Sequence, residues 1–203
     1  MIHIEQLEMG MIGTNCYIIS DEKKNCVIVD CDGTGREVFR YVEQNQLKPC
    51  AILLTHGHFD HVGAVEAVKE KYQCDVCIGA DDANLLAEPK LNCSYLNGRP
   101  ISITADKLFS DNEIFTVGDM QFKILFTPGH TQGSICFLIE NNIISGDTLF
   151  AGSCGRTDLP TGDWDTLLKS LQKLKVLEGE YKVFPGHGPA TTLSYERTHN
   201  PYM

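Results

Sequence analysis

The residues of this chain that could do chemistry are mostly histidines and aspartates that follow short apolar segments. Three histidines and one aspartate form the motif His-x-His-x-Asp-His directly after the apolar segment 51–55. Three further residues of these types, each beside a glycine, follow the apolar segments 121–127, 143–145 and 181–184. The seven candidate metal ligands are His56, His58, Asp60, His61, His130, Asp147 and His187.

Imidazole nitrogens and carboxylate oxygens together suit Zn²⁺, iron and Mn²⁺. A single tetrahedral ion needs three or four ligands, whereas seven are enough for two ions that share one carboxylate. A purely structural zinc is an alternative, but such sites are usually rich in cysteine and this cluster has none. Surface or helix-capping histidines are another, and the repeated strand-end pattern argues against them. The residues therefore predict two divalent cations, with Zn²⁺ as first choice and iron or manganese as alternatives.

These side chains can meet only if the strands before them end at one side of the fold, where α/β proteins commonly place their sites. Hydrophobic periodicity predicts further strands and several helices. The strands are expected at 2–7, 16–20, 26–30, 76–79, 113–117 and 134–140, and the helices at 35–45, 63–72, 81–88 and 164–177. We expect Ala67 on the buried face of the second helix and Asp81 as the N-cap of the third. The mixture indicates the α/β class.

Two segments of the chain resemble each other. Residues 52–58 and 124–130 are identical at five of seven positions, and each ends in a candidate ligand histidine. This predicts a single domain over residues 1–203, with two related halves at about 1–105 and 106–203.

The composition excludes several classes of function. The chain has 17 lysines and arginines against 27 aspartates and glutamates, a net charge of −10, which disfavours nucleic acids and anionic membranes as partners. Without an apolar segment of about 20 residues or a signal-like N-terminus, and with nine cysteines, we expect a cytoplasmic protein with free thiols. Cys74 and Cys77 should face opposite sides of a strand. The roles of Cys31 and Cys154 and the oligomeric state stay open.

The ordered ligand set, from His56 through His187, resembles the metal site of the metallo-β-lactamase-fold hydrolases. Residues 14–17 and 29–30 look like the opening strands of that superfamily, so the likeness covers nearly the whole chain. Segments 145–156 and 185–201 are similar to those of short bacterial glyoxalase II-like members. The resemblance implies an αββα sandwich, in which two mixed sheets face each other, helices cover the outer faces, and the site lies along one edge.

The resemblance also implies how the ligands are used. One metal would be held by His56, His58 and His130, and a second by Asp60, His61 and His187. Asp147 and a hydroxide would bridge the two ions, and Asp60 would act in catalysis together with that hydroxide. The implied reaction is hydrolysis of a small-molecule 2-hydroxyacyl thioester, such as S-lactoylglutathione or a related thiol ester.

Two features depart from the longer glyoxalase II enzymes. Those enzymes carry a C-terminal helical domain that helps to bind glutathione, which this chain is expected to lack. Their Glu-Tyr-Thr after the last metal histidine reads Gly-Pro-Ala-Thr here, and a Lys-x-Tyr pair reads Arg-Thr-Asp at 156–158. Arg156 is the one candidate for contact with an anionic part of the substrate. The acyl group and the thiol carrier therefore stay open.

Other functions fit the same residues. A mono-iron persulfide dioxygenase, which resembles this sequence, would use the counterparts of His56, His130 and Asp147. A different hydrolase on this scaffold could cleave lactones, β-lactams or phosphodiesters. A non-enzymatic metal-binding module is the remaining reading. The number of bound metals and a panel of substrates would distinguish these possibilities.

Overall fold

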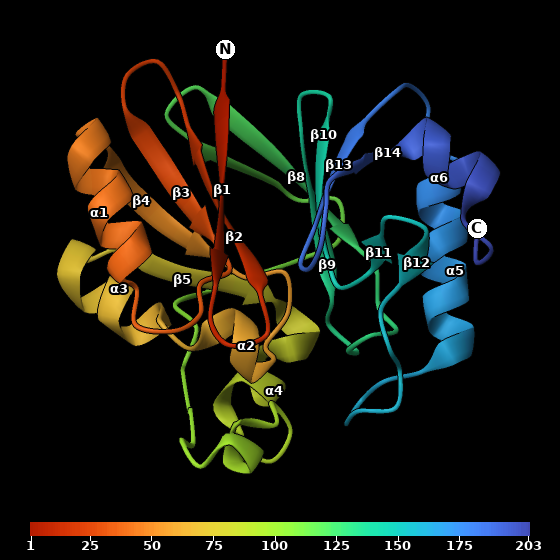
Figure 1. Cartoon of the computed structure of the whole chain (residues 1–203), viewed down its shortest axis with the longest axis horizontal. Helices are drawn as coiled ribbons and strands as arrows, with labels where there is room; N and C mark the ends of the chain where they lie inside the picture. Colours follow the sequence, from red (N-terminus) through yellow and green to blue (C-terminus); the bar gives the residue numbers. More distant parts are fainter.

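Two six-stranded β-sheets form the centre of the computed structural model, and helices cover their outer faces (Figure 1). The structure describes residues 1–203 with the exception of the side chain of Asn97. Residues up to Phe109 build the first sheet and residues from Ile114 onward build the second. The predicted αββα sandwich is confirmed, while the relationship between the two halves stays a prediction.

The first sheet is mixed. Its first three strands are antiparallel neighbours and the last four run parallel to one another. In spatial order the strands are β1 (His3–Met9), β2 (Thr14–Ser20), β3 (Asn25–Val29), β4 (Lys48–Leu53), β5 (Asp75–Gly79) and β6 (Lys107–Phe109). Its outer face is covered by α1 (Arg36–Asn45) and α3 (Val65–Tyr72).

The second sheet is also mixed, because β10 and β13 are parallel and the other neighbours are antiparallel. In spatial order its strands are β14 (Thr191–Thr192), β13 (Lys182–Pro185), β10 (Asn142–Gly146), β9 (Ile135–Ile139), β8 (Met120–Phe126) and β7 (Ile114–Val117). Its outer face is covered by α5 (Trp164–Lys175) and α6 (Leu193–His199).

Shorter elements connect the strands. These elements are α2 (Phe59–Val62), η1 (Ala80–Asp82), α4 (Ala83–Ala87), η2 (Ser94–Asn97) and the hairpin of β11 (Leu149–Phe150) and β12 (Ser153–Cys154). Figure 1 shows two of them, α2 and α4, at the lower end of the first sheet. Helix α2 and the β11–β12 hairpin follow strands whose ends carry candidate ligands, and the others lie between β5 and β6.

The core has three layers because both faces of each sheet are covered. On β2, Ile18 packs toward α1 and α3, whereas Tyr17 and Ile19 pack between the two sheets. Cys74 and Cys77 fall into different layers, which confirms that they face opposite sides. Strands buried on both faces lack a simple polar alternation, which is why they appear in the sequence as continuous apolar runs.

Two details of the helix predictions are wrong. Ala67 is exposed, because Val65 and Val68 form the buried face of α3 and a helix turns by about 100° per residue, which places Ala67 off that face. Asp81 is not an N-cap, because the chain enters α4 through the 3₁₀ turn η1, which contains Asp81. None of the helices formed by the described residues is both long and apolar enough to cross a membrane.

Candidate metal centre

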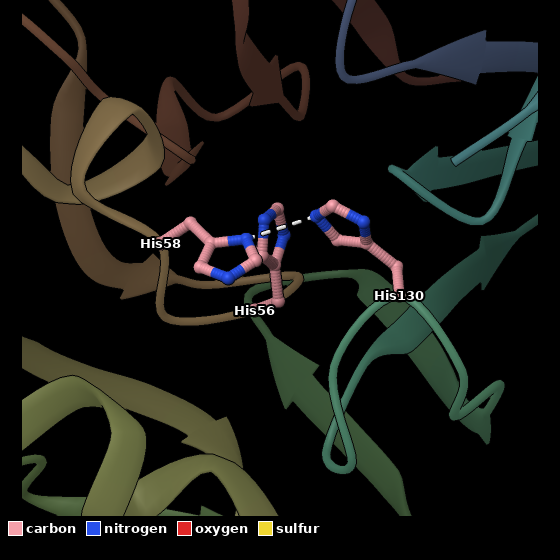
Figure 2. Close-up of side chains that lie close together, drawn as sticks. All are labelled: His56, His58 and His130. Carbon is pink, nitrogen blue, oxygen red and sulfur yellow. Dashed lines mark hydrogen bonds between the residues drawn. The ribbon is translucent and has the colours of Figure 1, made fainter. Parts of the chain in front are cut away.

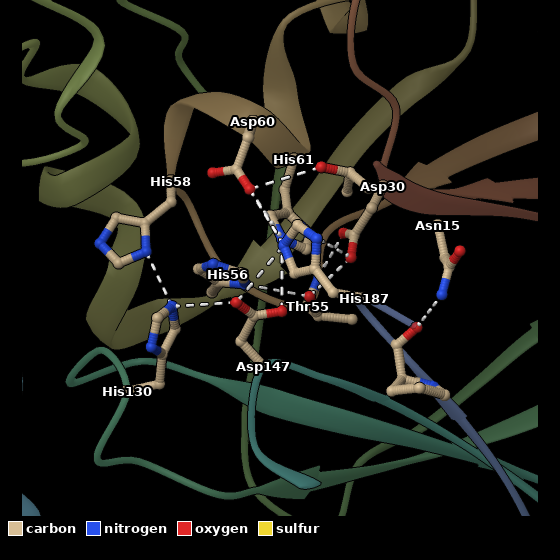
Figure 3. Close-up of polar contacts among 12 residues, drawn as sticks. Asn15, Asp30, Thr55, His56, His58, Asp60, His61, His130, Asp147 and His187 are labelled. Atoms are coloured by element: carbon tan, nitrogen blue, oxygen red, sulfur yellow. Dashed lines mark hydrogen bonds and ion pairs between the residues drawn. The ribbon is translucent and has the colours of Figure 1, made fainter. Parts of the chain in front are cut away.

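Four strand ends bring the seven candidate ligands together between the two sheets (Figure 3). The ends of β4, β8, β10 and β13 precede His56, His130, Asp147 and His187 respectively. The single turn of α2 directs Asp60 and His61 toward the same place, so that residues from both sheets meet there. Six of the seven side chains are almost fully shielded from solvent, and His187 is 26% exposed.

Two of the three groups that the candidate ligand atoms form match the predicted ligand sets. The first consists of one nitrogen each from His56, His58 and His130, which lie within 4.8 Å of one another (Figure 2). Within it, Nδ1 of His58 lies 2.9 Å from Nε2 of His130. The second group consists of Asp60, His61 and His187, with Nε2 of His187 3.2 Å from Oδ2 of Asp60. Both sequence-derived ligand sets therefore converge as triads, and a third group, of His56, His61 and Asp147, joins them.

Asp147 lies between these triads. Its Oδ1 is 3.4 Å from Nε2 of His61, in the second triad. Its Oδ2 is 3.5 Å from Nε2 of His130 and 3.7 Å from Nε2 of His187. A carboxylate with this placement can serve a cation in either triad, so the clusters are consistent with a binuclear metal site.

Several buried polar atoms at the centre fit bound cations. His56 Nε2, His61 Nε2 and Asp147 Oδ1 are buried and have no hydrogen-bond partner among the described residues. An unpaired buried polar atom costs about 1–3 kcal/mol. Divalent cations take up the lone pairs of such atoms. The residues present therefore fit one or two ions of this kind.

In His56 and His130, the ring nitrogen that faces away from the cluster contacts another protein group. Nδ1 of His56 lies 3.1 Å from Oγ1 of Thr55, and Nδ1 of His130 lies 2.7 Å from the carbonyl oxygen of Arg156. This arrangement is typical of metal-binding histidines, because a hydrogen bond at one nitrogen directs the lone pair of the other at the metal. His58 differs, since it directs its Nδ1 at the cluster.

The electrostatics differ between the triads. Burial and the neighbouring imidazoles lower the pKa of His56 well below its usual range and that of His58 to about 3. Burial alone would lower the pKa of His61, but the carboxylates of Asp60 and Asp147 raise it. The pKa of Asp147 falls although burial opposes ionisation, mainly because of the charge on His61. His56 and His58 are therefore neutral donors, whereas the second triad contains paired charges in the metal-free chain.

Sequence reasoning missed Asp30, which positions a ligand. Its buried carboxylate accepts hydrogen bonds from the backbone N–H and the hydroxyl of Thr55, at 2.9 and 2.7 Å. Its Oδ2 also lies 2.9 Å from Nδ1 of His61 (Figure 3). A signal was available, because Asp30 directly follows β3 in the same way that the ligands follow their strands.

Substitution of Asp30 by asparagine is expected to weaken the second metal position. The amide cannot accept all three hydrogen bonds, and changes of this kind typically lower metal affinity by about 10- to 100-fold. Titration of the metal-free protein with Zn²⁺ against a chelator measures the effect. Equal affinity in the variant and the wild type would contradict the role of Asp30.

Sequence reasoning also missed Asn15 and Tyr17, which hold the loop that carries His187. The hydroxyl of Tyr17 donates to the carbonyl oxygen of Pro185 at 2.6 Å. The side chain of Asn15 donates to the same oxygen and to that of Gly188, both at 2.9 Å. β2 of the first sheet thereby fixes a ligand loop of the second sheet.

The triads open into a cleft with a volume of about 700 Å³. Besides candidate ligands, apolar side chains and two thiols, those of Cys93 and Cys154, line its walls. Cys31 instead lies in the core behind the first sheet. The apolar side chains of the cleft are Ile12, Phe59, Leu96, Phe150 and Leu159.

Arg156 lies at this cleft and is largely exposed. Its guanidinium makes a bidentate pair with Asp158, in which Nε and Nη2 donate at 2.6 and 2.7 Å. An exposed pair of this kind contributes about 0–1 kcal/mol, so it can open when an anion competes. Arg156 is thus available to a substrate, but its charge is partly balanced.

Comparison with known proteins adds three findings. Residues 9–187 match the family described as the metallo-beta-lactamase superfamily. Hydroxyacylglutathione hydrolase GloC of Haemophilus influenzae is 33% identical over 208 residues, which cover 100% of this chain and 98% of GloC. The crystal structure of BLEG-1 B3 metallo-beta-lactamase is 40% identical, with a TM-score of 0.94 over 98% of this chain and 99% of that one.

A further solved structure bears on the metals. The crystal structure of TTHA1623, in a di-iron-bound form, is 33% identical to this chain. Its TM-score is 0.88, and the match covers 98% of this chain and 100% of TTHA1623. A similar fold can thus hold two irons.

Proposed function

Since this chain belongs to the metallo-beta-lactamase superfamily, we propose that it is a metal-dependent thioesterase that hydrolyses a 2-hydroxyacyl thioester, such as S-lactoylglutathione or a related thiol ester. The observation that carries the proposal is the pair of triads that share Asp147 and open into one cleft. The similarity to GloC supports this substrate class. We further propose that the protein is cytoplasmic, with small molecules rather than nucleic acids or membranes as partners.

The side chains have separate roles in this proposal. His56, His58 and His130 would hold one cation, Asp60, His61 and His187 the other, and Asp147 would contact both. When bound, two such cations lower the pKa of a water molecule and polarise the carbonyl group under attack. We propose Zn²⁺ as the metal, with iron or manganese as alternatives.

Asp60 is the proposed catalytic carboxylate. In the metal-free chain burial alone would raise its pKa, but the charge of His61 and the hydrogen bond from His187 lower it. Bound cations would replace the charge of His61 and would likewise keep the carboxylate ionised near neutral pH. It also lines the cleft, where it can orient the attacking water and hold the proton that the water loses. A thiolate leaving group has a pKa near 8.5, so the reaction needs no strong acid in the cleft.

The cleft constrains the substrate beyond its reacting bond. A volume of about 700 Å³ is in the range of sites for complete small-molecule ligands. Phe59 and Leu96 come from one half of the chain and Phe150 and Leu159 from the other, so both walls offer apolar contact. We propose that an apolar part of the acyl or thiol group lies along these walls.

Two alternatives are tested by the same material. A mono-iron dioxygenase would need only His56, His130 and Asp147 as ligands. The ligand atoms of Asp60, His61 and His187 lie equally close together here, which favours two ions. β-Lactam hydrolysis is the second candidate function, because the similar BLEG-1 structure is described as a metallo-beta-lactamase.

The deciding experiment combines metal content with a substrate panel. The purified protein is loaded with Zn²⁺, iron or Mn²⁺, and metal per chain is measured together with hydrolysis of S-lactoylglutathione, uncharged lactoyl thioesters and a chromogenic cephalosporin. We expect two metals per chain and thioester turnover well above the rate without enzyme. Thioester rates at background with every metal would refute the proposal, and cephalosporin turnover alone would favour the second candidate.

Arg156 and Asp158 give a specific test of substrate contact. Replacing Arg156 with glutamine is expected to raise KM for S-lactoylglutathione about two- to fivefold with little change in kcat, because one exposed charge contact is lost. Asp158→Asn should lower the same KM, since it frees the guanidinium. An uncharged thioester serves as the control substrate, and equal effects on both substrates would argue against direct contact.

A further inference from the structure

Asp82, at the end of η1, joins the two loops that carry the first triad. Its carboxylate is fully buried and accepts three hydrogen bonds. Oδ2 accepts from the backbone N–H of Gly57 at 3.0 Å and from the hydroxyl of Thr131 at 2.8 Å. Oδ1 accepts from the backbone N–H of Gly133 at 2.8 Å. Gly57 lies between two candidate ligands, and Thr131 directly follows a third.

The backbone around Asp82 is packed tightly against both loops. A Cβ atom on Gly57 would lie 2.8 Å from Cδ2 of Leu85, on α4. A Cβ atom on Gly133 would lie 2.2 Å from the backbone nitrogen of Asp82, and one on Gly79 would lie 2.5 Å from the carbonyl oxygen of Gly133. The segment that follows β5 is therefore wedged between the two ligand loops.

Further contacts fix the second of these loops. The hydroxyls of Thr131 and Ser134 lie 2.7 Å apart, and the side chain of Gln132 donates to the carbonyl oxygen of Asp81 at 2.7 Å. Burial raises the pKa of Asp82, although its three hydrogen-bond donors oppose the rise. The loop after His130 thus has one defined position relative to η1.

The two triads are supported only in part by different residues, because Thr55, whose hydroxyl contacts His56, donates to the same Asp30 that contacts His61. Asp60 and His61 share the turn of α2, and Asp30 contacts His61 directly. His58 and His130 come from opposite sheets, and Figure 2 shows them on two separate loops with 2.9 Å between the facing nitrogens. A connection between those loops is therefore needed to hold the first triad, and Asp82 makes one through the backbone.

We propose that Asp82 is a positioning residue for the metal held by His56, His58 and His130. It contacts no reacting atom and acts through Gly57 and Thr131. The proposal rests on the two-metal site of the proposed function, but not on the identity of the substrate.

The test uses two variants as backgrounds, each of which keeps the complete ligand set of only one metal position. In His187→Ala only the first metal position keeps all its ligands, and in His58→Ala only the second does. Asp82→Asn is added to each, and Zn²⁺ affinity is measured by chelator competition. We expect an affinity about 10- to 100-fold lower in the His187→Ala background and unchanged affinity in the His58→Ala background. Asp81→Asn, at the exposed neighbouring aspartate, is the matched control and should change neither.

A second variant keeps the test decisive if Asp82→Asn does not fold. Thr131→Val has nearly the same shape and removes one of the three donors, so it should weaken the same metal position by about three- to tenfold. Loss of affinity in both backgrounds, or in neither, would overturn the proposal. Because Zn²⁺ affinity is measured without substrate, failure of the thioesterase proposal would leave this result readable.

Discussion

Replacing Asp147 with asparagine is expected to lower turnover by at least about 10³-fold and to reduce the bound metal from two ions per chain to one or fewer. Asp147 is the one candidate ligand that faces both triads, with Oδ1 near His61 and Oδ2 near His130. The asparagine amide would remove the negative charge and would place an NH₂ group where one carboxylate oxygen faces these nitrogens. Losing several kcal/mol of charge stabilisation corresponds to this change in rate, at about 1.4 kcal/mol for each tenfold step.

Metal content and kcat/KM of the Asp147→Asn variant are measured with the thioester that the wild type cleaves best. Asp165→Asn is a matched control, because Asp165 is exposed in the first turn of α5. The control should keep both metals and full activity. Wild-type turnover in the Asp147 variant would contradict the shared role of this carboxylate, even if one metal were lost.

The candidate ligands could be predicted because four of the chain segments that carry them follow closely after a strand, and Asp60 and His61 lie in the short turn after the first of these segments. His56 and His58 follow β4, and Asp147 follows β10, so a strand that ends at the site places its ligand there regardless of distant packing. The layered fold was predictable for a related reason. Strands buried on both faces are apolar throughout, and helices that cover a sheet carry one apolar stripe.

Of the supporting residues, Asp30 follows a strand as the ligands do, but Asp82 could not be predicted in this way. Asp82 is recognised only through donors on Gly57 and on a loop some 50 residues later, and nothing in the residues near it indicates that contact. The prediction for Asp81 failed because a local 3₁₀ turn sets the start of α4, and the prediction for Ala67 failed because it lies off the apolar stripe of Val65 and Val68. Arg156 was identified, but its pair with Asp158 depends on side-chain geometry that spacing does not reveal.

Removing the metals is expected to lower the thermal stability of the protein, by about 8–16 °C in Tm. Two ions would join four strand ends from both sheets, so they would stabilise the folded chain and not the unfolded one. Counting only the more tightly bound ion, a ligand present at 1,000 times its Kd contributes about 4 kcal/mol, and 1 kcal/mol shifts Tm by about 2–4 °C for a chain of this size.

The unpartnered atoms make the sign of this change clear. Without cations, His56 Nε2, His61 Nε2 and Asp147 Oδ1 remain buried with no partner among the described residues, so the folded state loses stabilisation that the unfolded chain recovers from water. Calorimetry of chelator-treated protein, with metal content verified, gives the apo Tm. Adding back Zn²⁺ should restore the wild-type Tm, whereas Mg²⁺, which prefers oxygen ligands, should not. If the Tm were unchanged after complete removal, the seven residues would not be acting as a metal centre that joins the two sheets.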